Sequence, residues 1–168
     1  MEPYRPPHAE AFTILIVEDH PESLELMEAY LRTRYPLIVT ATDGEAALAA
    51  VAEHHPDLIL LDIMLPRLDG FEVCRRLKAD PATKSISIVM VTGLTGADNI
   101  ERAVAAGADD FLTKPINGAE LRLRVRSLLR LRHLQRELDE TLDLMDHLQI
   151  EDGAIRPAPP DREGHADQ

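Results

Sequence analysis

Short β-branched or apolar runs alternate with amphipathic segments from Thr13 to Phe111, which is the pattern of a parallel sheet covered by helices. Most of the runs are continuously apolar, as expected for strands that are covered on both faces. The pattern predicts a doubly wound α/β fold with five parallel strands. The predicted strands are Thr13–Val17, Leu37–Thr40, Leu58–Leu61, Ile86–Thr92 and Asp110–Thr113.

Apolar residues recur every three or four positions after each of the first four runs, so each group lies on one face of a helix. The single cysteine, Cys74, excludes an internal disulfide and a multi-cysteine metal site, and its place in this pattern predicts simple packing. We expect these helix faces to cover the sheet: Leu24, Met27 and Leu31; Ala47 and Val51; Cys74 and Leu77; and Ile100 and Val104.

An unbroken helical pattern runs from about Gly118 to Ile150, which corresponds to roughly 50 Å of helix. A compact domain needs less, so we expect residues 12–130 to form the domain and residues 131–150 to extend from it as a coiled coil in a homodimer. Helix fold-back on the same domain is the alternative, and both parallel and antiparallel pairing fit the pattern. The predicted dimer seam is Leu131, Leu134, Leu138, Thr141, Met145 and Leu148.

The net charge of -12 is concentrated near the C-terminus, because residues 137–168 contain ten acidic residues against Arg156 and Arg162. An acidic chain repels phosphate backbones, which argues against direct nucleic-acid binding.

No run approaches the roughly 20 apolar residues that span a bilayer, and no secretory signal is present, so we expect a cytoplasmic protein without membrane insertion. Residues 1–11 are expected to be flexible, and residues 151–168 form a disordered acidic tail.

Polar residues follow four of the five predicted strands. Glu18 and Asp19 follow the first strand, Asp62 lies at the end of the third, Thr92 ends the fourth, and Lys114 follows the fifth. Because ligands bind beyond the carboxyl ends of parallel strands, we expect these side chains to converge. Three neighbouring carboxylates need a cation, and oxygen ligands with room for water suit Mg2+, which Mn2+ can replace.

This set of groups suits attack by the Asp62 carboxylate on a phosphoryl group, with a metal ion and Lys114 neutralising charge. The Thr92 hydroxyl can donate a hydrogen bond to a phosphoryl oxygen. Each residue alone has a simpler explanation, because acidic pairs in loops are usually solvated, a strand-end Asp often caps a helix, and Lys-Pro often forms a turn. Their order at successive strand ends favours a phosphoryl site.

The chain resembles the receiver domain of bacterial two-component response regulators in four segments: ILIVEDHPES, LILLDIMLPRLDGFEV, IVMVTGLTG and GADDFLTKPIN. The resemblance covers about residues 12–130, and no recognisable output domain follows, as in stand-alone receivers. Thr92 and Lys114 lie 30 and 52 residues beyond Asp62, close to the spacing in that family. The resemblance implies a flavodoxin-like sheet with the strand order 2-1-3-4-5.

The resemblance also implies the role of each site residue. Asp62 would be the phosphoacceptor, and Asp19, Asp62 and the carbonyl oxygen of Met64 would ligate Mg2+ directly, with Glu18 acting through a water molecule. The phosphoryl group would come from a sensor histidine kinase or a phosphotransfer protein. A downstream protein partner would receive the signal.

A conformational switch is implied as well. Thr92 would move toward the phosphoryl group, and Phe111 on the fifth strand would turn inward, although a buried core Phe is the simpler interpretation. Because Phe111 has no hydroxyl, packing would drive this rotation. The Lys114–Pro115 peptide bond is expected to be cis, as is usual in the family.

Three other functions fit the fold class less well. A phosphohydrolase with an aspartyl-phosphate commonly carries a second acid two residues after the nucleophile, where this chain has Met64. A flavin or nucleotide module needs a Gly- or Ser/Thr-rich loop after the first strand, where this chain has VEDHPES. A degenerate receiver that only dimerises would not need an intact set of Asp19, Asp62, Thr92 and Lys114. The sequence therefore predicts a phosphoacceptor switch and not an enzyme with a separate substrate.

Met64 and Leu94 follow Asp62 and Thr92 by two residues, at positions that modulate the access of water in receivers. Both side chains are apolar, so we expect the phosphorylated state to last longer than a few minutes. Phosphate release from the phosphorylated protein measures this lifetime. A lifetime of seconds would contradict the expectation.

Overall fold

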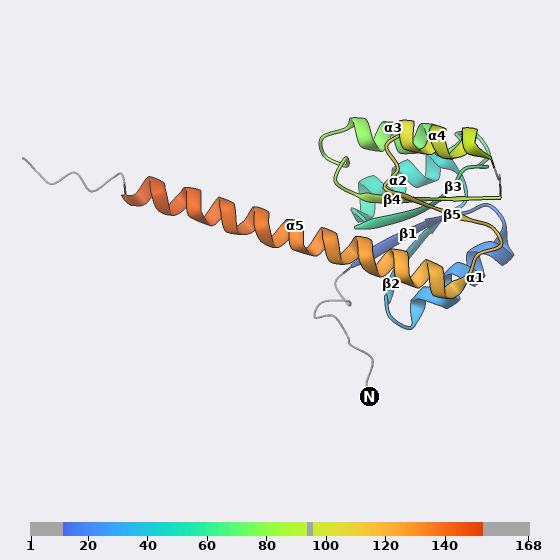
Figure 1. The fold of residues 1–168 in the computed structure, drawn as a ribbon, viewed down its shortest axis with the longest axis horizontal. Coiled ribbons are helices and arrows are strands. Elements are labelled where there is room, and N and C mark those ends of the chain that lie inside the picture. Colours follow the sequence, from blue (N-terminus) through green and yellow to red (C-terminus); the bar gives the residue numbers. More distant parts are fainter. Residues whose placement is uncertain (1–11, 94–95, 153–168) are drawn as a thin grey trace, which may run out of the picture. The chain divides into compact units, whose positions relative to one another are not determined.

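The computed structural model describes residues 12–93 and 96–152, which divide into one unit that ends at Arg132 and a second that begins at His133 (Figure 1). The first unit contains a parallel sheet in the order β2-β1-β3-β4-β5. This order confirms the predicted doubly wound, flavodoxin-like fold. The strands are β1 (Thr13–Val17), β2 (Leu37–Ala41), β3 (Leu58–Asp62), β4 (Ser87–Thr92) and β5 (Asp110–Thr113).

Three strand bounds differ from the prediction by one residue each. β4 begins after Ile86, because the N–H of Ile86 donates to the carbonyl oxygen of Thr83 in the preceding turn at 3.0 Å. β3 extends to Asp62, because Asp62 still pairs with Val91 of β4. β2 likewise extends by one residue to Ala41.

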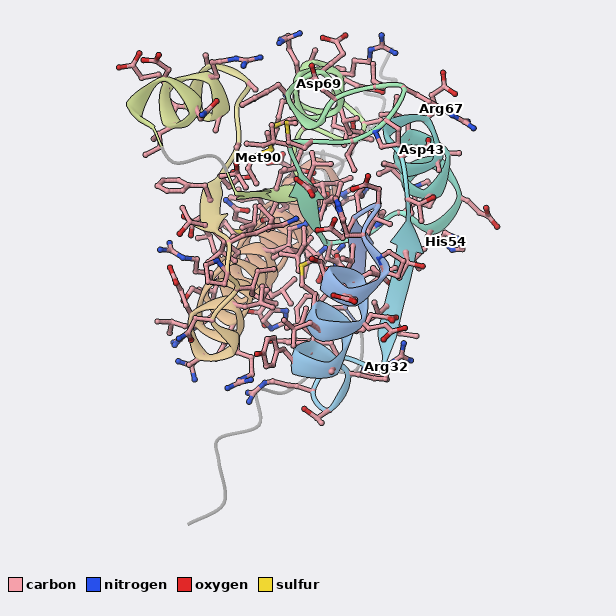
Figure 2. All side chains as sticks on the ribbon, turned by 90° about the vertical axis from the view of Figure 1, so that its right-hand side faces the viewer. Arg32, Asp43, His54, Arg67, Asp69 and Met90 are labelled. Carbon is pink, nitrogen blue, oxygen red and sulfur yellow. The ribbon has the colours of Figure 1, made fainter. Side chains whose placement is uncertain are left out.

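Polar side chains or a proline begin most of the helices. Asp43 and Asp69, labelled in Figure 2, each accept a hydrogen bond of 2.8 Å from a backbone N–H in the first turn of their helix. Asn117 accepts one of 2.9 Å in the same way, and Pro21 begins the first helix. The helices are α1 (Pro21–Arg32), α2 (Gly44–His54), α3 (Gly70–Ala79), α4 (Ala97–Ala105) and α5 (Gly118–Asp152).

Helices cover both faces of the sheet in the first unit (Figure 1). On one face, α1 packs through Met27 and Leu31, beside Leu121 and Val125 from the first part of α5. On the other face lie α2, α3 and α4. The predicted faces of the first three helices are confirmed, and their buried residues on the second face are Ala47, Val51, Cys74 and Leu77.

The predicted buried face of α4 is wrong. Val104 is 69% exposed and Ile100 is also exposed, whereas Ala103 and Ala106 are buried against the sheet. Alanine side chains are short, so they let the helix backbone lie close to the strands. Both sets of residues have helical spacing, and periodicity alone does not distinguish the face with larger side chains from the face that is buried.

Cys74 is buried, and its thiol donates to the carbonyl oxygen of Ala106 at 3.4 Å. Burial raises the pKa of this thiol to about 11, so the reactive thiolate is scarce at neutral pH. The side chain therefore packs as the sequence predicts. Within the described ranges, no helix is both long and apolar enough to cross a membrane.

The second unit contains the remainder of α5, which ends at Asp152, two residues later than predicted. Glu151 and Asp152 therefore belong to the helix and not to the expected tail. The expected flexible N-terminus (residues 1–11), the rest of that tail (residues 153–168) and the side chain of Leu148 lie outside the part of the chain that the structure describes.

Four apolar side chains of the second unit are 51–58% exposed, and their spacing of three or four residues places them on one side of the helix. Leu142 is one of them and does not belong to the predicted seam, which instead includes Thr141. Leu131, which is part of the first unit, is exposed to a similar degree. We call the following residues the apolar stripe: Leu134, Leu138, Leu142 and Met145.

Candidate functional site

The register of the sheet brings three of the predicted site residues to one edge. Asp62 ends β3 and pairs with Val91, the residue before Thr92 on β4. Thr92 in turn pairs with Thr113, the residue before Lys114. In a parallel sheet these positions share the carboxyl edge, so Asp62, Thr92 and Lys114 lie on three adjacent strands at the same level.

Glu18 reaches this edge from the other side of β3. Val17, the residue before it, pairs with Leu61, and the N–H of Glu18 donates to the carbonyl oxygen of Ala41 at 3.0 Å. This backbone hydrogen bond continues the pairing of β1 with β2 and orients the Glu18 side chain. Glu18 is fully buried, while the side chain of Asp19 is 31% exposed. Glu18 therefore lies deeper below the surface than Asp19.

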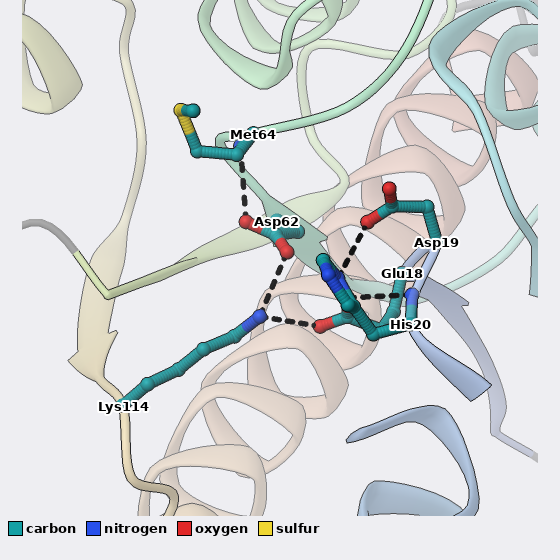
Figure 3. A network of polar contacts seen from close by, with 6 residues as sticks. All are labelled: Glu18, Asp19, His20, Asp62, Met64 and Lys114. Carbon is teal, nitrogen blue, oxygen red and sulfur yellow. Dashed lines mark hydrogen bonds and ion pairs between the residues drawn. The ribbon is translucent and has the colours of Figure 1, made fainter. Parts of the chain in front are cut away.

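Lys114 lies between two carboxylates (Figure 3). Its Nζ donates to Oε2 of Glu18 and to Oδ2 of Asp62, at 2.8 Å in each case. The side chains of Glu18 and Asp62 are 0% and 3% exposed. Hydrogen bonds between ionised groups are among the strongest in proteins, and little water competes with them here. Lys114 therefore holds both carboxylates in place.

Burial and Lys114 act in opposite directions on the pKa values of this cluster. Burial raises the pKa of Asp62, and hydrogen bonds from Lys114 and from the N–H of Met64 offset only part of this effect. Burial also raises the pKa of Glu18, but hydrogen bonds from Lys114 and the N–H of His20 outweigh it and lower the pKa. Burial lowers the pKa of Lys114, and its two carboxylate partners raise it above its ordinary value. Lys114 therefore stays charged beside an ionised Glu18.

The donor atoms at this edge fit a divalent cation. One donor atom from each of Glu18, Asp19, His20 and Asp62 lies within 4.8 Å of the others. The buried Oδ1 of Asp19 accepts no hydrogen bond within the described part of the chain, although Nδ1 of His20 lies 3.0 Å away in an ion-pair contact that needs a protonated imidazole. Glu18, Asp19 and Asp62 bring three carboxylates to this edge, and the ammonium of Lys114 contacts two of them. The excess of negatively charged oxygen ligands suits Mg2+.

Two residues at this edge are absent from the sequence-based prediction. His20 directly follows the acidic pair, and that position is the signal by which it could have been found. Gly70 begins α3, and its N–H donates to the carbonyl oxygen of Ile63 at 3.0 Å. A Cβ atom at Gly70 would overlap the carbonyl oxygen of Asp62. A glycine at this position thus allows α3 to begin directly against the end of β3.

The remaining predicted residues lie around this cluster. Thr92 and Phe111 line a cavity of about 150 Å³ between β4, β5 and α4, and Phe111 is only partly buried. The Met64 side chain is exposed, while its N–H donates to Oδ1 of Asp62 at 3.0 Å. Leu94 lies outside the described residues. The cis Lys114–Pro115 bond is confirmed.

The family model of the response regulator receiver domain matches residues 14–126. The chain belongs to this receiver family. The receiver is 47% identical to the response regulator PleD of Caulobacter vibrioides over 125 residues, which are 74% of this chain and 28% of PleD. It is 41% identical to RpaA of Synechocystis sp., named as a DNA-binding transcriptional regulator, over 70% of this chain and 48% of RpaA. The chain thus spans about a quarter to a half of the length of these curated relatives.

A solved structure agrees with this assignment. The signal receiver domain of a DNA-binding response regulator from Colwellia psychrerythraea superposes with a TM-score of 0.67 at 34% identity, over 71% of this chain and 98% of that one. The family model and this superposition therefore agree that the chain contains a receiver domain.

The close contact at Gly70 generates a stability prediction. Gly70→Ala should lower the free energy of unfolding by about 1–3 kcal/mol, because the added methyl group displaces the backbone of Asp62. This should occur even though Ala has the higher helix propensity. Urea denaturation measures the change. Gly93→Ala is the control, because a Cβ atom there meets nothing within 4 Å. Equal effects of the two substitutions would contradict the prediction.

Proposed function

We propose that Asp62 is the phosphoacceptor of this receiver and that a sensor histidine kinase or a phosphotransfer protein supplies the phosphoryl group. The observation that carries this proposal is the position of Lys114, whose Nζ lies 2.8 Å from carboxylate oxygens of both Glu18 and Asp62. Such an ammonium can pair with Asp62 before transfer and with a phosphoryl oxygen afterwards. A carboxylate that served only to cap a helix would not need it.

The chemistry follows from the residues at this edge. A carboxylate oxygen of Asp62 attacks phosphorus, the bond between phosphorus and the donor breaks, and an acyl phosphate forms. Lys114 neutralises charge on the transferred group, and the hydroxyl of Thr92 donates a hydrogen bond to one of its oxygens. No general base is needed, because the attacking oxygen belongs to an ionised carboxylate. The receiver thus catalyses its own modification and has no separate substrate.

The proposal includes a divalent ion, Mg2+ or in its place Mn2+. Asp19, Asp62 and the carbonyl oxygen of Met64 would hold it directly, and Glu18 would act through a water molecule. When bound, such an ion neutralises negative charge on a transferring phosphoryl group. The supporting observations are the excess of carboxylates at the edge and the Oδ1 of Asp19, which accepts no hydrogen bond within the described residues.

The output of the receiver is proposed to be a switch read by a downstream protein. Thr92 and Phe111 line the same cavity, so a movement of Thr92 toward a phosphoryl group would change the space open to the Phe111 ring. Phe111 has no hydroxyl, and packing would therefore drive its inward rotation. The surface from about residue 97 to residue 130 would change with it.

We propose that residues 12–130 form the receiver domain, that residues 131–150 form a coiled coil and that the chain is a homodimer in the cytoplasm. Each apolar stripe can be buried by the stripe of a second copy, since a two-fold interface is self-complementary. The sequence of α5 is basic from Arg122 to Arg136 and acidic from Glu137 to Asp146, so opposite charges would meet in an antiparallel pair and like charges in a parallel one. The net charge of -12 supports the proposal that the residues of this sequence do not bind nucleic acid directly.

Phosphorylation by acetyl phosphate tests the role of Asp62. In the presence of Mg2+, the wild-type protein should gain one phosphate that is stable in acid and labile in base, and the intact mass measures this gain. Asp62→Asn should gain none, and removal of the ion with a chelator should prevent the reaction. Asp69→Asn is the matched control, because Asn caps a helix as well as Asp does. A phosphate on the Asp62→Asn protein would assign the acceptor elsewhere.

Light scattering tests the homodimer. The wild-type protein should be a dimer at micromolar concentration, and Leu138→Glu should make it a monomer because a charge cannot be buried between the two stripes. Leu144→Glu should leave the dimer intact, since Leu144 is exposed but lies off the stripe. Added salt should weaken an antiparallel dimer, in which opposite charges meet, and strengthen a parallel one. A wild-type monomer in both phosphorylation states would refute the dimer.

A further inference from the structure

The imidazole of His20 faces the acidic edge (Figure 3). Its Nδ1 lies 3.0 Å from Oδ1 of Asp19 and 3.2 Å from Oε1 of Glu18. His20 is also the N-cap residue of α1, where a side chain commonly accepts a hydrogen bond from the first turn of the helix, but the His20 side chain makes no such bond. The ring therefore contacts the carboxylates and does not cap the helix.

His20 and Lys114 use different oxygens of this edge. Lys114 donates to Oε2 of Glu18 and Oδ2 of Asp62, whereas His20 lies against Oε1 of Glu18 and Oδ1 of Asp19. Nδ1 of His20, Oε1 of Glu18 and Oδ1 of Asp19 therefore lie next to each other, and Nζ of Lys114 donates to other oxygens. His20 is 69% exposed, so its ring can adjust to an incoming ion at little cost in packing.

The distance between His20 and Asp19 agrees with that between neighbouring ligands of one metal ion. Two ligand atoms at right angles, each about 2.1 Å from an ion, are about 3.0 Å apart. Nδ1 of His20 lies 3.0 Å from Oδ1 of Asp19, whereas its 3.2 Å contact with Oε1 of Glu18 is a hydrogen bond. Imidazole nitrogen is a preferred ligand of divalent first-row transition metals, whereas Mg2+ is bound almost entirely by oxygen. A ligand at this position thus distinguishes between the two kinds of ion.

We propose that His20 is a metal ligand that determines selectivity and gives this receiver a preference for a divalent first-row transition-metal ion over Mg2+. The inference rests on the proposed function, since the ion would occupy the acidic edge beside Asp62. It adds a nitrogen donor to the oxygen ligands named above. The expected consequence is a site whose occupant depends on the relative supply of the two kinds of ion.

Isothermal titration of the full chain with Ni2+ and with Mg2+, compared with His20→Ala, tests the proposal. The substitution should weaken Ni2+ binding by about tenfold or more and change Mg2+ binding much less. Pulsed electron paramagnetic resonance of bound Mn2+ should show coupling to a nitrogen nucleus that disappears in His20→Ala. His54→Ala is the control, because His54 is exposed at the end of α2 and contacts Glu53. It should leave both readouts unchanged.

The outcomes separate this inference from the proposal on which it rests. If wild-type protein binds Mn2+ and is phosphorylated on Asp62, but shows no nitrogen coupling or loses affinity for Ni2+ and Mg2+ equally in His20→Ala, the role of His20 is overturned and the phosphoacceptor stands. If the wild-type protein binds none of these ions, both the metal site and the role of His20 are overturned. Coupling that persists in His20→Ala would assign the nitrogen to another residue and also overturn the inference.

Discussion

Two buried carboxylates share the ammonium of Lys114, and the other features of the site depend on this interaction. Removal of a carboxylate from water costs several kcal/mol unless a charge and hydrogen bonds compensate for it. Lys114 compensates for Glu18 and Asp62 at 2.8 Å each, but Asp19 adds a third carboxylate with no comparable partner. The edge therefore retains an excess of negative charge. That excess favours the binding of a cation, and the low exposure of Asp62 ensures that a cation near it is weakly screened.

The fold and most of the site could be predicted from the sequence, because parallel strands buried on both faces are nearly continuous apolar runs. Such runs locate strand ends to within one residue, and the ends of neighbouring strands meet at one edge of the sheet. Asp62, Thr92 and Lys114 are thus brought together by pairing alone. The chemical interpretation of the site depends only on which residues occupy these ends, and the resemblance to a family then adds a role for each of them.

The features that could not be predicted depend on contacts between segments. The prediction of which face of α4 is buried was wrong. Ala103 is buried against the sheet whereas the larger Val104 is exposed, and helical spacing alone does not distinguish the two faces. Gly70 matters because the carbonyl oxygen of Asp62 lies where its side chain would be, and no pattern along the chain records that distance. His20 stands next to the acidic pair in the sequence, but its contacts with Asp19 and Glu18 depend on the direction of its ring, which no pattern along the chain records.

Leu142 shows how the period assumed for a helix changes the surface it is expected to present. A strict seven-residue repeat selects Thr141, whereas a straight helix with 3.6 residues per turn places Leu142 on the apolar stripe. Leu134 and Met145 are 11 residues apart, a spacing that closes on itself after three turns of a nearly straight helix. In the proposed dimer, two helices that bury Leu142 would therefore run almost straight beside each other at this level. Pairing through Thr141 would instead require a left-handed supercoil and would bury a hydroxyl that already donates to the carbonyl oxygen of Glu137 at 2.7 Å. The larger apolar area of Leu142 favours the straighter arrangement.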